Sequence, residues 1–341
     1  MKKILVTGGL GYIGSHTVVE LQLAGFEVVI LDNLSNSSED VLQGIERITG
    51  ILPTFEKLDL RDKQATISFF QKYGDLEGII HFAASKAVGE SVANPLLYYE
   101  NNLSTLITIL QQVQQKNNFS FIFSSSCTVY GQAETMPISE DAPVQQAFSP
   151  YGNTKQIGEE ILRDTAKVTQ GLQVISLRYF NPIGAHPSTE IGELPDGVPQ
   201  NLVPFITQTA IGLRKELSVF GKDYSTKDGT CIRDYIHVVD LAKAHVVALK
   251  RLLEQKNETT FEVFNIGTGT GSSVLEVIES FERVSQQSLN YKIVGRREGD
   301  VISAYADTTK ANTILGWKAT STLDEAMRSA WNWEQKIRKQ Q

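Results

Sequence analysis

The chain contains little cysteine, no long apolar run and no excess of positive charge. Its 341 residues include only two cysteines, Cys127 and Cys231, which lie far apart. This count excludes a disulfide framework and a paired-cysteine metal site, and it favours a reducing compartment, so we expect a cytoplasmic protein. The apolar stretch at the N-terminus stops at Gly8, and no other reaches the ~18 residues that a membrane-spanning helix needs. We therefore expect neither membrane insertion nor export.

Acidic residues outnumber basic ones. Aspartate and glutamate number 39 against 32 lysines and arginines, which gives a formal net charge of −7. Such a balance is poorly suited to an extended nucleic-acid surface, so we expect no nucleic-acid partner. A local pocket for an anionic small molecule is still compatible with it. Any phosphate group must then be held by particular residues.

Short apolar runs alternate with longer segments of helical periodicity through the first half of the chain. This alternation is typical of repeated βα units, which build a parallel sheet covered by helices on both faces. We therefore predict an α/β fold with a doubly wound parallel sheet of the Rossmann type. The expected strands are Lys3–Val6, Glu27–Leu31, Thr54–Leu58, Gly78–Phe82, Ser120–Ser124 and Gln173–Arg178, and the expected helices are Ile13–Ala24, Asp40–Thr49, Gln64–Lys72, Leu96–Lys116 and Tyr151–Gln170.

The composition changes after Phe180. Residues 181–203 are rich in proline, glycine and acidic side chains and show little periodicity. We place a boundary here, between a first domain of residues 1–180 and a smaller C-terminal α/β domain of residues 181–341. Segments near Asp240 and Phe264 are expected to fold back onto the first domain. The expected elements after the boundary are helices at Asn201–Leu213, Val238–Leu253, Ser273–Val284 and Leu323–Ile337 and strands at Leu217–Phe220 and Glu262–Asn265.

A glycine-rich loop directly follows the first strand and opens into a helix. Gly8, Gly11 and Gly14 let the backbone turn sharply and approach a pyrophosphate, while the free N–H groups of the helix start attract the anion. Asp32 ends the next strand, near the offset of about 20 residues expected of the acid that bonds the adenosine ribose. Its carboxylate would repel a 2′-phosphate, so NAD is favoured over NADP. The alternative is a glycine-rich turn capped by a solvated Asp32.

Tyr151 and Lys155 lie four residues apart, so they share one face of the helix that Ser149 and Pro150 are expected to start. A neighbouring ammonium and a nicotinium ring both favour the phenolate form of a tyrosine. Lowering its pKa by about three units needs about 4 kcal/mol. Such a pair also occurs by chance on amphipathic helices.

Hydroxyl side chains end the strand that precedes this helix. Ser126 can relay a proton between a substrate hydroxyl and Tyr151. Ser124 and Ser125 are expected mainly to terminate the strand. The combination of Ser126 with Tyr151 and Lys155 favours a catalytic site over a chance pattern.

Eight segments in collinear order carry a family resemblance: TGGLGYIGSH, HFAASKAVGES, SSSCTVYG, SPYGNTK, RYFNPIGAH, IRDYIHVVDLA, NIGTG and RREGD. Together they resemble the extended short-chain dehydrogenase/reductase family, and specifically its UDP-glucose/UDP-galactose 4-epimerase members. The match runs from residue 2 to about residue 318, which is more specific than any single motif. The resemblance implies an isomerase that takes a UDP-hexose through a 4-keto intermediate with transient reduction of NAD. It assigns NAD to the first domain and the sugar nucleotide to the second.

The resemblance also implies roles for individual residues. Tyr151 would be the general base and acid, Lys155 would bind the nicotinamide ribose and lower the tyrosine pKa, and Ser126 would assist proton transfer. The expected cofactor-binding residues are Gly8, Gly11, Tyr12, Ile13, Gly14, Asp32, Asn33, Asp59, Leu60, Phe82, Ala83, Ala84, Lys86, Asn101, Ser124, Tyr151, Lys155 and Phe180. For Asn101, the alternative is a polar residue on a helix face. No metal ligand is expected.

The same resemblance assigns the substrate side. Arg233 and Arg297 match the family's phosphate-binding arginines, whose forked guanidinium can bind two oxygens at once, and Asp300 matches a uridine-ribose contact. The expected substrate-binding residues are Ser126, Tyr151, Asn181, Asn201, Leu202, Val219, Phe220, Arg233, Arg297, Asp300 and Ala304. Without the resemblance, those of the second domain would be ordinary surface or packing residues.

Two positions depart from the family pattern. Gln200 stands where an asparagine is expected, and Ala304 stands where some members restricted to simple hexoses carry tyrosine. Our hypothesis is that Ala304 leaves space for a 2-N-acetyl group, so that UDP-GlcNAc and UDP-GalNAc also turn over. A homodimer formed through the helices at Leu96–Lys116 and Tyr151–Gln170 is a further expectation from the resemblance.

Three other functions stay open. A sugar-nucleotide 4,6-dehydratase of the same family would place an Asp-Glu pair after the strand-end serine, whereas Cys127 and Thr128 follow Ser126 here. A UDP-glucuronate or other decorated-sugar epimerase differs only in its substrate. A cofactor-sensing module without catalysis is disfavoured by the intact Ser126, Tyr151 and Lys155 set.

Overall fold

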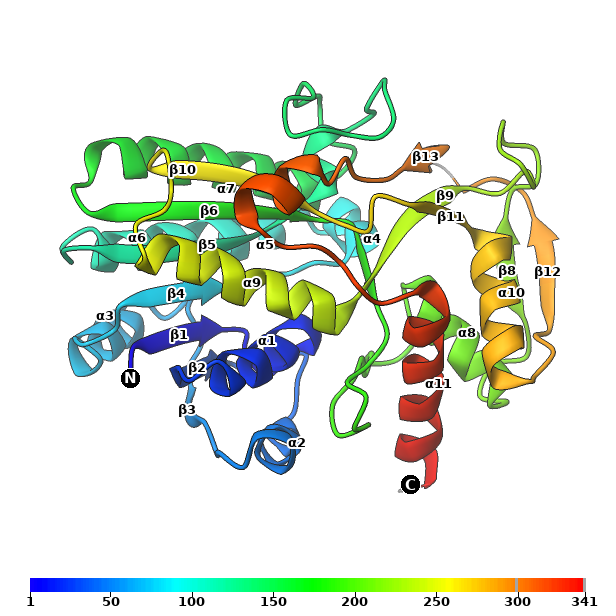
Figure 1. The fold of residues 1–341 in the computed structure, drawn as a ribbon, viewed down its shortest axis with the longest axis horizontal. Coiled ribbons are helices and arrows are strands. Elements are labelled where there is room, and N and C mark those ends of the chain that lie inside the picture. The colour runs from blue at the N-terminus through cyan, green and yellow to red at the C-terminus, as the bar shows by residue number, and fades with distance from the viewer. Residues whose placement is uncertain (298–299, 340–341) are drawn as a thin grey trace.

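A computed structural model of the chain describes residues 1–297 and 300–339. A central sheet of seven strands, all parallel to their neighbours, forms the larger part of the molecule (Figure 1). Their spatial order is β10 (Phe261–Ile266), β6 (Leu172–Tyr179), β5 (Phe119–Ser126), β4 (Gly78–His81), β1 (Lys3–Thr7), β2 (Glu27–Asp32) and β3 (Thr54–Lys57). The predicted doubly wound parallel sheet is confirmed, with all six strands expected in the first half.

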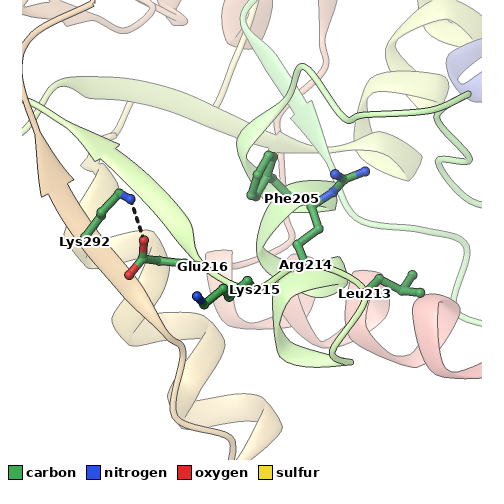
Figure 2. Close-up of a pocket in the computed structure, with 6 residues that line it drawn as sticks. All are labelled: Phe205, Leu213, Arg214, Lys215, Glu216 and Lys292. Carbon is green, nitrogen blue, oxygen red and sulfur yellow. Dashed lines mark ion pairs between the residues drawn. The ribbon is translucent and has the colours of Figure 1, made fainter.

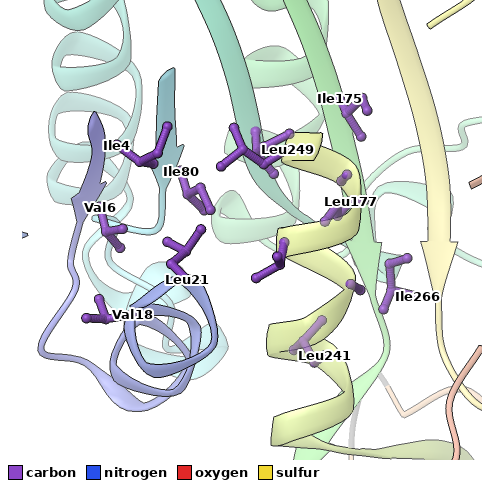
Figure 3. Close-up of a cluster of buried hydrophobic side chains, with 14 of the residues drawn as sticks. Ile4, Val6, Val18, Leu21, Ile80, Ile175, Leu177, Leu241, Leu249 and Ile266 are labelled. Atoms are coloured by element: carbon purple, nitrogen blue, oxygen red, sulfur yellow. The ribbon is translucent and has the colours of Figure 1, made fainter. Parts of the chain in front are cut away.

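Helices cover both faces of this sheet because successive side chains of a strand point to opposite sides. Ile4 and Val6 of β1 face a cluster that includes α1 (Tyr12–Leu23) and α9 (Val238–Leu253), which Figure 3 shows. Leu5 faces the opposite cluster. The helices that contribute side chains to the Leu5 cluster are α3 (Lys63–Lys72), α6 (Thr105–Val113) and α7 (Pro150–Val168). At the outer edge of the sheet, α2 (Asp40–Thr49) packs against α1.

The single helix expected at Leu96–Lys116 is wrong. The structure divides this region into α5 (Pro95–Tyr99), a π-helical turn η1 (Glu100–Ser104) and α6, preceded by α4 (Val88–Ala93). Asn102, within the π turn, is buried and donates a hydrogen bond to Thr154 Oγ1 on α7. The wider turn therefore directs a polar side chain inward, a feature that π turns often supply at functional sites.

Two small sheets build the remainder of the molecule, at the right of Figure 1. In the first, β9 (Ile232–His237) pairs with three short strands: β7 (Asn181–Ile183), β11 (Gly271–Ser273) and β13 (Ser303–Ala304). In the second, β8 (Leu217–Phe220) pairs with β12 (Tyr291–Val294). The surrounding helices are α8 (Leu202–Ala210), α10 (Val274–Ser285) and α11 (Leu323–Lys339). Two single turns lie against the large sheet and its helices instead: η2 (Cys127–Tyr130), beside α7 and β6, and η3 (Ala311–Leu315), beside α9 and β10. Of these strands, only β8 was predicted.

Two segments from the second half of the chain complete the large sheet. β10 pairs with β6 from Phe261 opposite Val174 to Ile266 opposite Tyr179, and it forms the edge of the sheet. α9 packs against α1 and over β5 and β6. The sequence boundary at residues 180 and 181 stays a prediction.

Within residues 1–297 and 300–339, no helix combines the length and the apolar character required to cross a bilayer. The same residues contain no group of three or more histidine, cysteine, aspartate or glutamate side chains placed to hold a metal ion.

Candidate active site

The glycine loop joins β1 to α1 at the point where the strand order of the sheet reverses, since β1 lies between β2 and β4. Ligands of doubly wound folds bind at this crevice. A Cβ on Gly14 would lie 2.2 Å from the carbonyl oxygen of Gly8, and one on Gly8 would lie 2.9 Å from the backbone nitrogen of Ala83. The loop is therefore closed too tightly for side chains. Tyr12 and Ile13 open the helix, whose first N–H groups have no partner within it.

Asp32 lies buried at the carboxyl end of β2. Its carboxylate accepts hydrogen bonds from the N–H groups of Leu10 (3.1 Å) and Leu34 (2.9 Å) and from Ser37 Oγ (2.9 Å). A carboxylate has about four acceptor positions, so one is left for a ribose hydroxyl. The closed loop, the free N–H groups and this acceptor fit a dinucleotide.

Asn33, Asp59 and Leu60 follow the second and third strands. Asn33 donates to Asp59 Oδ2 (3.1 Å), and Arg61 Nη2 donates to the same oxygen (2.6 Å). The hydrogen bond from Arg61 lowers the pKa of Asp59 to about 2. The Leu60 side chain is buried in the hydrophobic core, so only its backbone can face a ligand.

The segment after β4 forms the other wall of the crevice. Phe82, Ala83 and Ala84 are half-buried, and Lys86 is exposed. Asn101 donates to Ser85 Oγ (3.1 Å). Its neighbour in the π turn, Asn102, accepts from the backbone N–H of Ser85 (2.8 Å) and donates to its carbonyl oxygen (3.0 Å).

Tyr151, Lys155 and Ser126 meet where α7 passes the end of β5. The helix begins as predicted, because Ser149 Oγ caps it by accepting from the N–H of Gly152 (3.2 Å). Lys155 is 5% exposed, and its Nζ donates to the carbonyl oxygen of Ser124 (2.7 Å). This nitrogen lies 5.8 Å from the centre of the Tyr151 ring.

The electrostatics of this cluster differ from the sequence-based expectation. Burial raises the pKa of Tyr151 to about 12, against the opposing effect of its hydrogen bond with Ser126. Burial also lowers the pKa of Lys155 to about 8, while the negative charge of Glu159 raises it. The lowering of the tyrosine pKa expected from Lys155 is thus not found in the protein alone, because desolvation of the phenolate dominates.

Ser124 and Ser125 do more than terminate the strand. The Ser124 carbonyl holds Lys155, and Ser125 Oγ donates to Glu159 Oε1 (2.6 Å). The strand runs to Ser126, two residues beyond its expected end. The expectation for these two serines was wrong because long-range partners cannot be read from a strand-end pattern.

Four expected substrate residues come together at the carboxyl end of β8. Arg297 donates to Asp300 Oδ1 (2.6 Å), and its guanidinium carbon lies 5.6 Å from the centre of the Phe220 ring. Arg233 Nη2 lies 3.6 Å from the same carboxylate oxygen. The cluster carries a net positive charge beside an exposed aromatic ring, which suits a diphosphate joined to a flat base.

The remaining expected substrate residues have mixed positions. Asn181 is exposed at the start of β7, and Asn201 precedes α8 and donates to Glu193 Oε1 (2.8 Å). Val219 is buried in the apolar cluster around β8 and α11, so only its backbone can face a ligand, whereas Leu202 is half-buried against the same cluster. Ala304 packs against the apolar cluster that contains Phe180.

A surface hollow lies away from this site (Figure 2). The described residues that line it are Phe205, Leu213, Arg214, Lys215, Glu216 and Lys292, and they include none of the expected site residues. Leu213–Glu216 precede β8, whereas Phe220 ends it. The hollow is therefore at the opposite end of that strand.

Three polar residues near the site were not predicted from the sequence: Asn102, Glu159 and Glu193. Glu193 Oε1 accepts a hydrogen bond from Asn201. Burial and, to a smaller extent, the negative charge of Glu193 raise the pKa of Tyr12, whose hydroxyl donates to the carbonyl oxygen of Gly184 (2.6 Å). Glu159 had a visible signal, since it stands four residues after Lys155 and thus on the same helical face. Glu193 had none.

Comparisons with known proteins indicate the family to which this chain belongs. The GDP-mannose 4,6 dehydratase family model matches residues 5–330. UDP-glucose 4-epimerase of Bacillus subtilis (strain 168) is 51% identical over 331 residues, which are 97% of this chain and 96% of that protein.

Solved structures give the same result. The crystal structure of UDP-glucose-4-epimerase from Stenotrophomonas maltophila with bound NAD and formylated UDP-arabinopyranose has a TM-score of 0.95 at 45% identity and covers 100% of both chains. That of UDP-glucose 4-epimerase from Bifidobacterium longum in complex with NAD+ and UDP has a TM-score of 0.92 at 44% identity and covers 98% of both chains. This chain therefore belongs to the UDP-glucose 4-epimerase family, within the extended short-chain dehydrogenases/reductases.

Proposed function

We propose that this chain is an NAD-dependent isomerase that interconverts UDP-galactose and UDP-glucose. The observation that carries the proposal is the meeting of Ser126, Tyr151 and Lys155 at the edge of the sheet that also holds the glycine loop. The relatives of similar length that bear the name UDP-glucose 4-epimerase support it. Galactose metabolism is the corresponding role.

In the proposed reaction, Tyr151 removes the proton of the sugar 4-hydroxyl as C4 is oxidised to a ketone. When bound, NAD supplies a hydride acceptor and donor and the positive charge of its nicotinamide ring. Ser126, hydrogen-bonded to Tyr151, passes the proton between substrate and phenol. The keto sugar then turns about its diphosphate linkage, so that reduction from the opposite side inverts C4.

Lys155 has two tasks in this scheme. Its ammonium is fixed by the Ser124 carbonyl, and it faces the Tyr151 ring. It can therefore bind the nicotinamide ribose and stabilise the phenolate at the same time. Because burial in the protein alone raises the pKa of Tyr151 to about 12, the phenolate depends on additional positive charge at the site.

Arg233, Arg297 and Asp300 are proposed to hold the diphosphate and the uridine ribose, with Phe220 against the base. The proximity of the two guanidinium groups to one carboxylate supports this assignment. Arg297 is more exposed than Arg233, so it is the freer of the two to reach a phosphate.

A 4,6-dehydratase is the main alternative, and it is also the activity in the name of the matching family model. Elimination of water needs an acid beside the strand-end hydroxyl. Cys127 and Thr128 occupy these positions, and burial raises the pKa of Cys127 to about 11. Neither side chain is a carboxylic acid, which favours the epimerase.

The proposed function is tested by incubating the purified protein, without added cofactor, with UDP-galactose. Formation of UDP-glucose, identified by chromatography and NMR, is the expected result. A 4-keto-6-deoxy product would instead identify a dehydratase, and absence of any product would contradict both.

Ala304 is proposed to admit a 2-N-acetyl group. It lies opposite Arg233 in the pairing of β13 with β9 and packs beside Phe180, so it stands between the expected diphosphate and nicotinamide positions. We expect the protein to epimerise UDP-GalNAc as well as UDP-galactose. Ala304→Tyr should reduce UDP-GalNAc turnover about 100-fold while UDP-galactose turnover stays within a few-fold, because the added ring fills the space of the acetyl group.

The measurement is the initial rate with each substrate, and Ala304→Ser is the matched control because it adds a single atom. A wild-type protein that turns over UDP-galactose but not UDP-GalNAc would contradict this assignment.

A homodimer is proposed to form through the segment that contains α5, η1 and α6 together with α7. Leu96 and Ile107 are exposed on that segment and Val168 is exposed at the end of α7, with Leu96 80% exposed. We expect the wild type to show twice the chain mass of 37.8 kDa in light scattering. Leu96→Glu should shift it toward the monomer, whereas Leu23→Glu, an equivalent change at an exposed leucine of α1, should not. A monomeric wild type would refute the proposal.

A cytoplasmic location is also proposed. Within the described residues, Cys127 and Cys231 form no disulfide, which is compatible with a reducing compartment.

A further inference from the structure

Glu159 lies one helical turn beyond Lys155 on α7 and is 3% exposed. Its carboxylate accepts hydrogen bonds from Ser125 Oγ on β5 (2.6 Å) and Ser176 Oγ on β6 (2.8 Å). Arg178 of β6 donates to it through Nε (3.0 Å) and Nη2 (2.6 Å). A charge this deeply buried is costly unless fully paired, so its hydrogen bonds fix its position.

The partners of Glu159 surround the reacting groups without being among them. Ser125 stands between Ser124, whose carbonyl holds Lys155, and Ser126, which is hydrogen-bonded to Tyr151. The carboxylate thus joins the helix that carries two of these groups to the strand that carries the third.

Charge gives Glu159 a second effect. Burial lowers the pKa of Lys155 to about 8, and the carboxylate of Glu159 counteracts this. Of the other groups around Lys155, the buried His81 on β4 has a pKa lowered to about 3 by desolvation and by the charge of Lys155, so it is neutral. Tyr151 and Tyr179 are neutral phenols in the protein alone, because burial raises the pKa of each. Arg178 is charged as well, and its guanidinium is paired directly with the Glu159 carboxylate.

We propose that Glu159 is a positioning residue for the reaction, one that locks α7 to β5 and keeps the Lys155 ammonium charged beside Tyr151. It acts through these residues and does not touch the substrate. The inference rests on the proposed function, since it assumes that Tyr151 and Lys155 are the reacting pair.

The test is Glu159→Gln, assayed with UDP-galactose across the pH range in which the wild type is folded. We expect kcat at neutral pH to fall about tenfold with KM within twofold. The profile of kcat against pH should narrow by about one unit at each limb. The alkaline limb should move to lower pH because Lys155 loses its proton more easily, and the acid limb should move to higher pH because Tyr151 loses its proton less easily beside a weaker positive charge.

Glu262→Gln is the matched control for loss of a buried carboxylate. Glu262 accepts from Arg251 through Nε (2.7 Å) and Nη2 (2.9 Å), in a pair buried between β10 and α9. The Glu262→Gln substitution should lower the melting temperature as Glu159→Gln does, but it should leave both limbs of the pH profile at their wild-type positions. A Glu159→Gln protein with wild-type limb positions would overturn the proposal.

Two substitutions that remove less than Glu159→Gln keep the test valid if that variant fails to fold. Ser125→Ala and Ser176→Ala each remove one buried hydroxyl from Glu159 Oε1, but only Ser125 belongs to the strand that carries Ser124 and Ser126. We expect Ser125→Ala to lower kcat about threefold or more and Ser176→Ala to leave it unchanged. Equal losses in both would count against positioning.

A readout without turnover separates this inference from the proposed function. The near-ultraviolet tyrosinate absorbance of the NAD-loaded protein, minus that of its Tyr151→Phe variant, reports the ionisation of Tyr151 alone. Glu159→Gln should move this titration to higher pH whether or not UDP-galactose is the substrate. An unmoved titration would reject the role of Glu159, whereas a moved one with no UDP-galactose turnover would reject only the proposed function.

Discussion

Tyr151→Phe should reduce the conversion of UDP-galactose about 10³-fold while the protein stays folded and retains NAD. The variant loses one hydroxyl and keeps the ring against Lys155, so the base disappears and the pocket persists. General acid–base groups typically contribute 10²–10⁴-fold, which sets this expectation. The measurement is kcat with UDP-galactose, together with the NAD content of the purified protein.

Tyr73→Phe is the matched control. Tyr73 directly follows α3, and its hydroxyl donates to Glu56 Oε1 (2.5 Å). Removal of this hydroxyl should leave kcat unchanged. If Tyr151→Phe keeps more than about a tenth of wild-type turnover, the hydroxyl is not the general base. In a cofactor-sensing module without catalysis, neither substitution would change a turnover, because there would be none to change.

Gly14→Ala should abolish the retention of NAD. Its Cβ would lie 2.2 Å from the carbonyl oxygen of Gly8 and 2.9 Å from the Cα of Gly9, and both are backbone atoms that no side-chain rotation can move away. The loop must therefore open, which displaces the N–H groups that face a pyrophosphate. We expect NAD affinity to fall at least about 100-fold and stability to fall by about 1–3 kcal/mol, as overpacking does.

NAD bound per chain after gel filtration and thermal unfolding with and without added NAD measure these two effects. Gly89→Ala, on α4, is the control, because among the described residues no heavy atom beyond its chain neighbours and the backbone of its own helix lies within 4 Å of its added Cβ. A Gly14→Ala protein that carries a full equivalent of NAD would show that the loop does not hold the cofactor.

The parallel sheet and its glycine loop were predictable because their signals are local. Each buried strand reads as a short apolar run, and Gly8, Gly11 and Gly14 stand directly after the first. The strands around β9 carry no such signal, since β13 is two residues long and β11 three. Their pairing depends on where the large domain places β9, which periodicity does not encode.

The candidate active site also has features that could be predicted from the sequence and features that could not. The spacing of Tyr151 and Lys155 and the strand-end Ser126 were visible as patterns. The π turn at Asn102 was not, because it arises from hydrogen bonds to Ser85 and Thr154, residues far away in the sequence. The raised pKa of Tyr151 was also missed, since burial is a property of the folded protein.

The edge position of β10 matters during synthesis of the chain on the ribosome. β6 ends at Tyr179, yet the strand that covers its outer side begins only at Phe261. Until that later segment emerges, the nascent sheet exposes a row of unpaired N–H and C=O groups along Leu172–Tyr179, which can recruit a foreign strand and aggregate. A gene fragment cut after residue 180 would keep this open edge permanently, so a stable nucleotide-binding fragment requires the chain through Ile266.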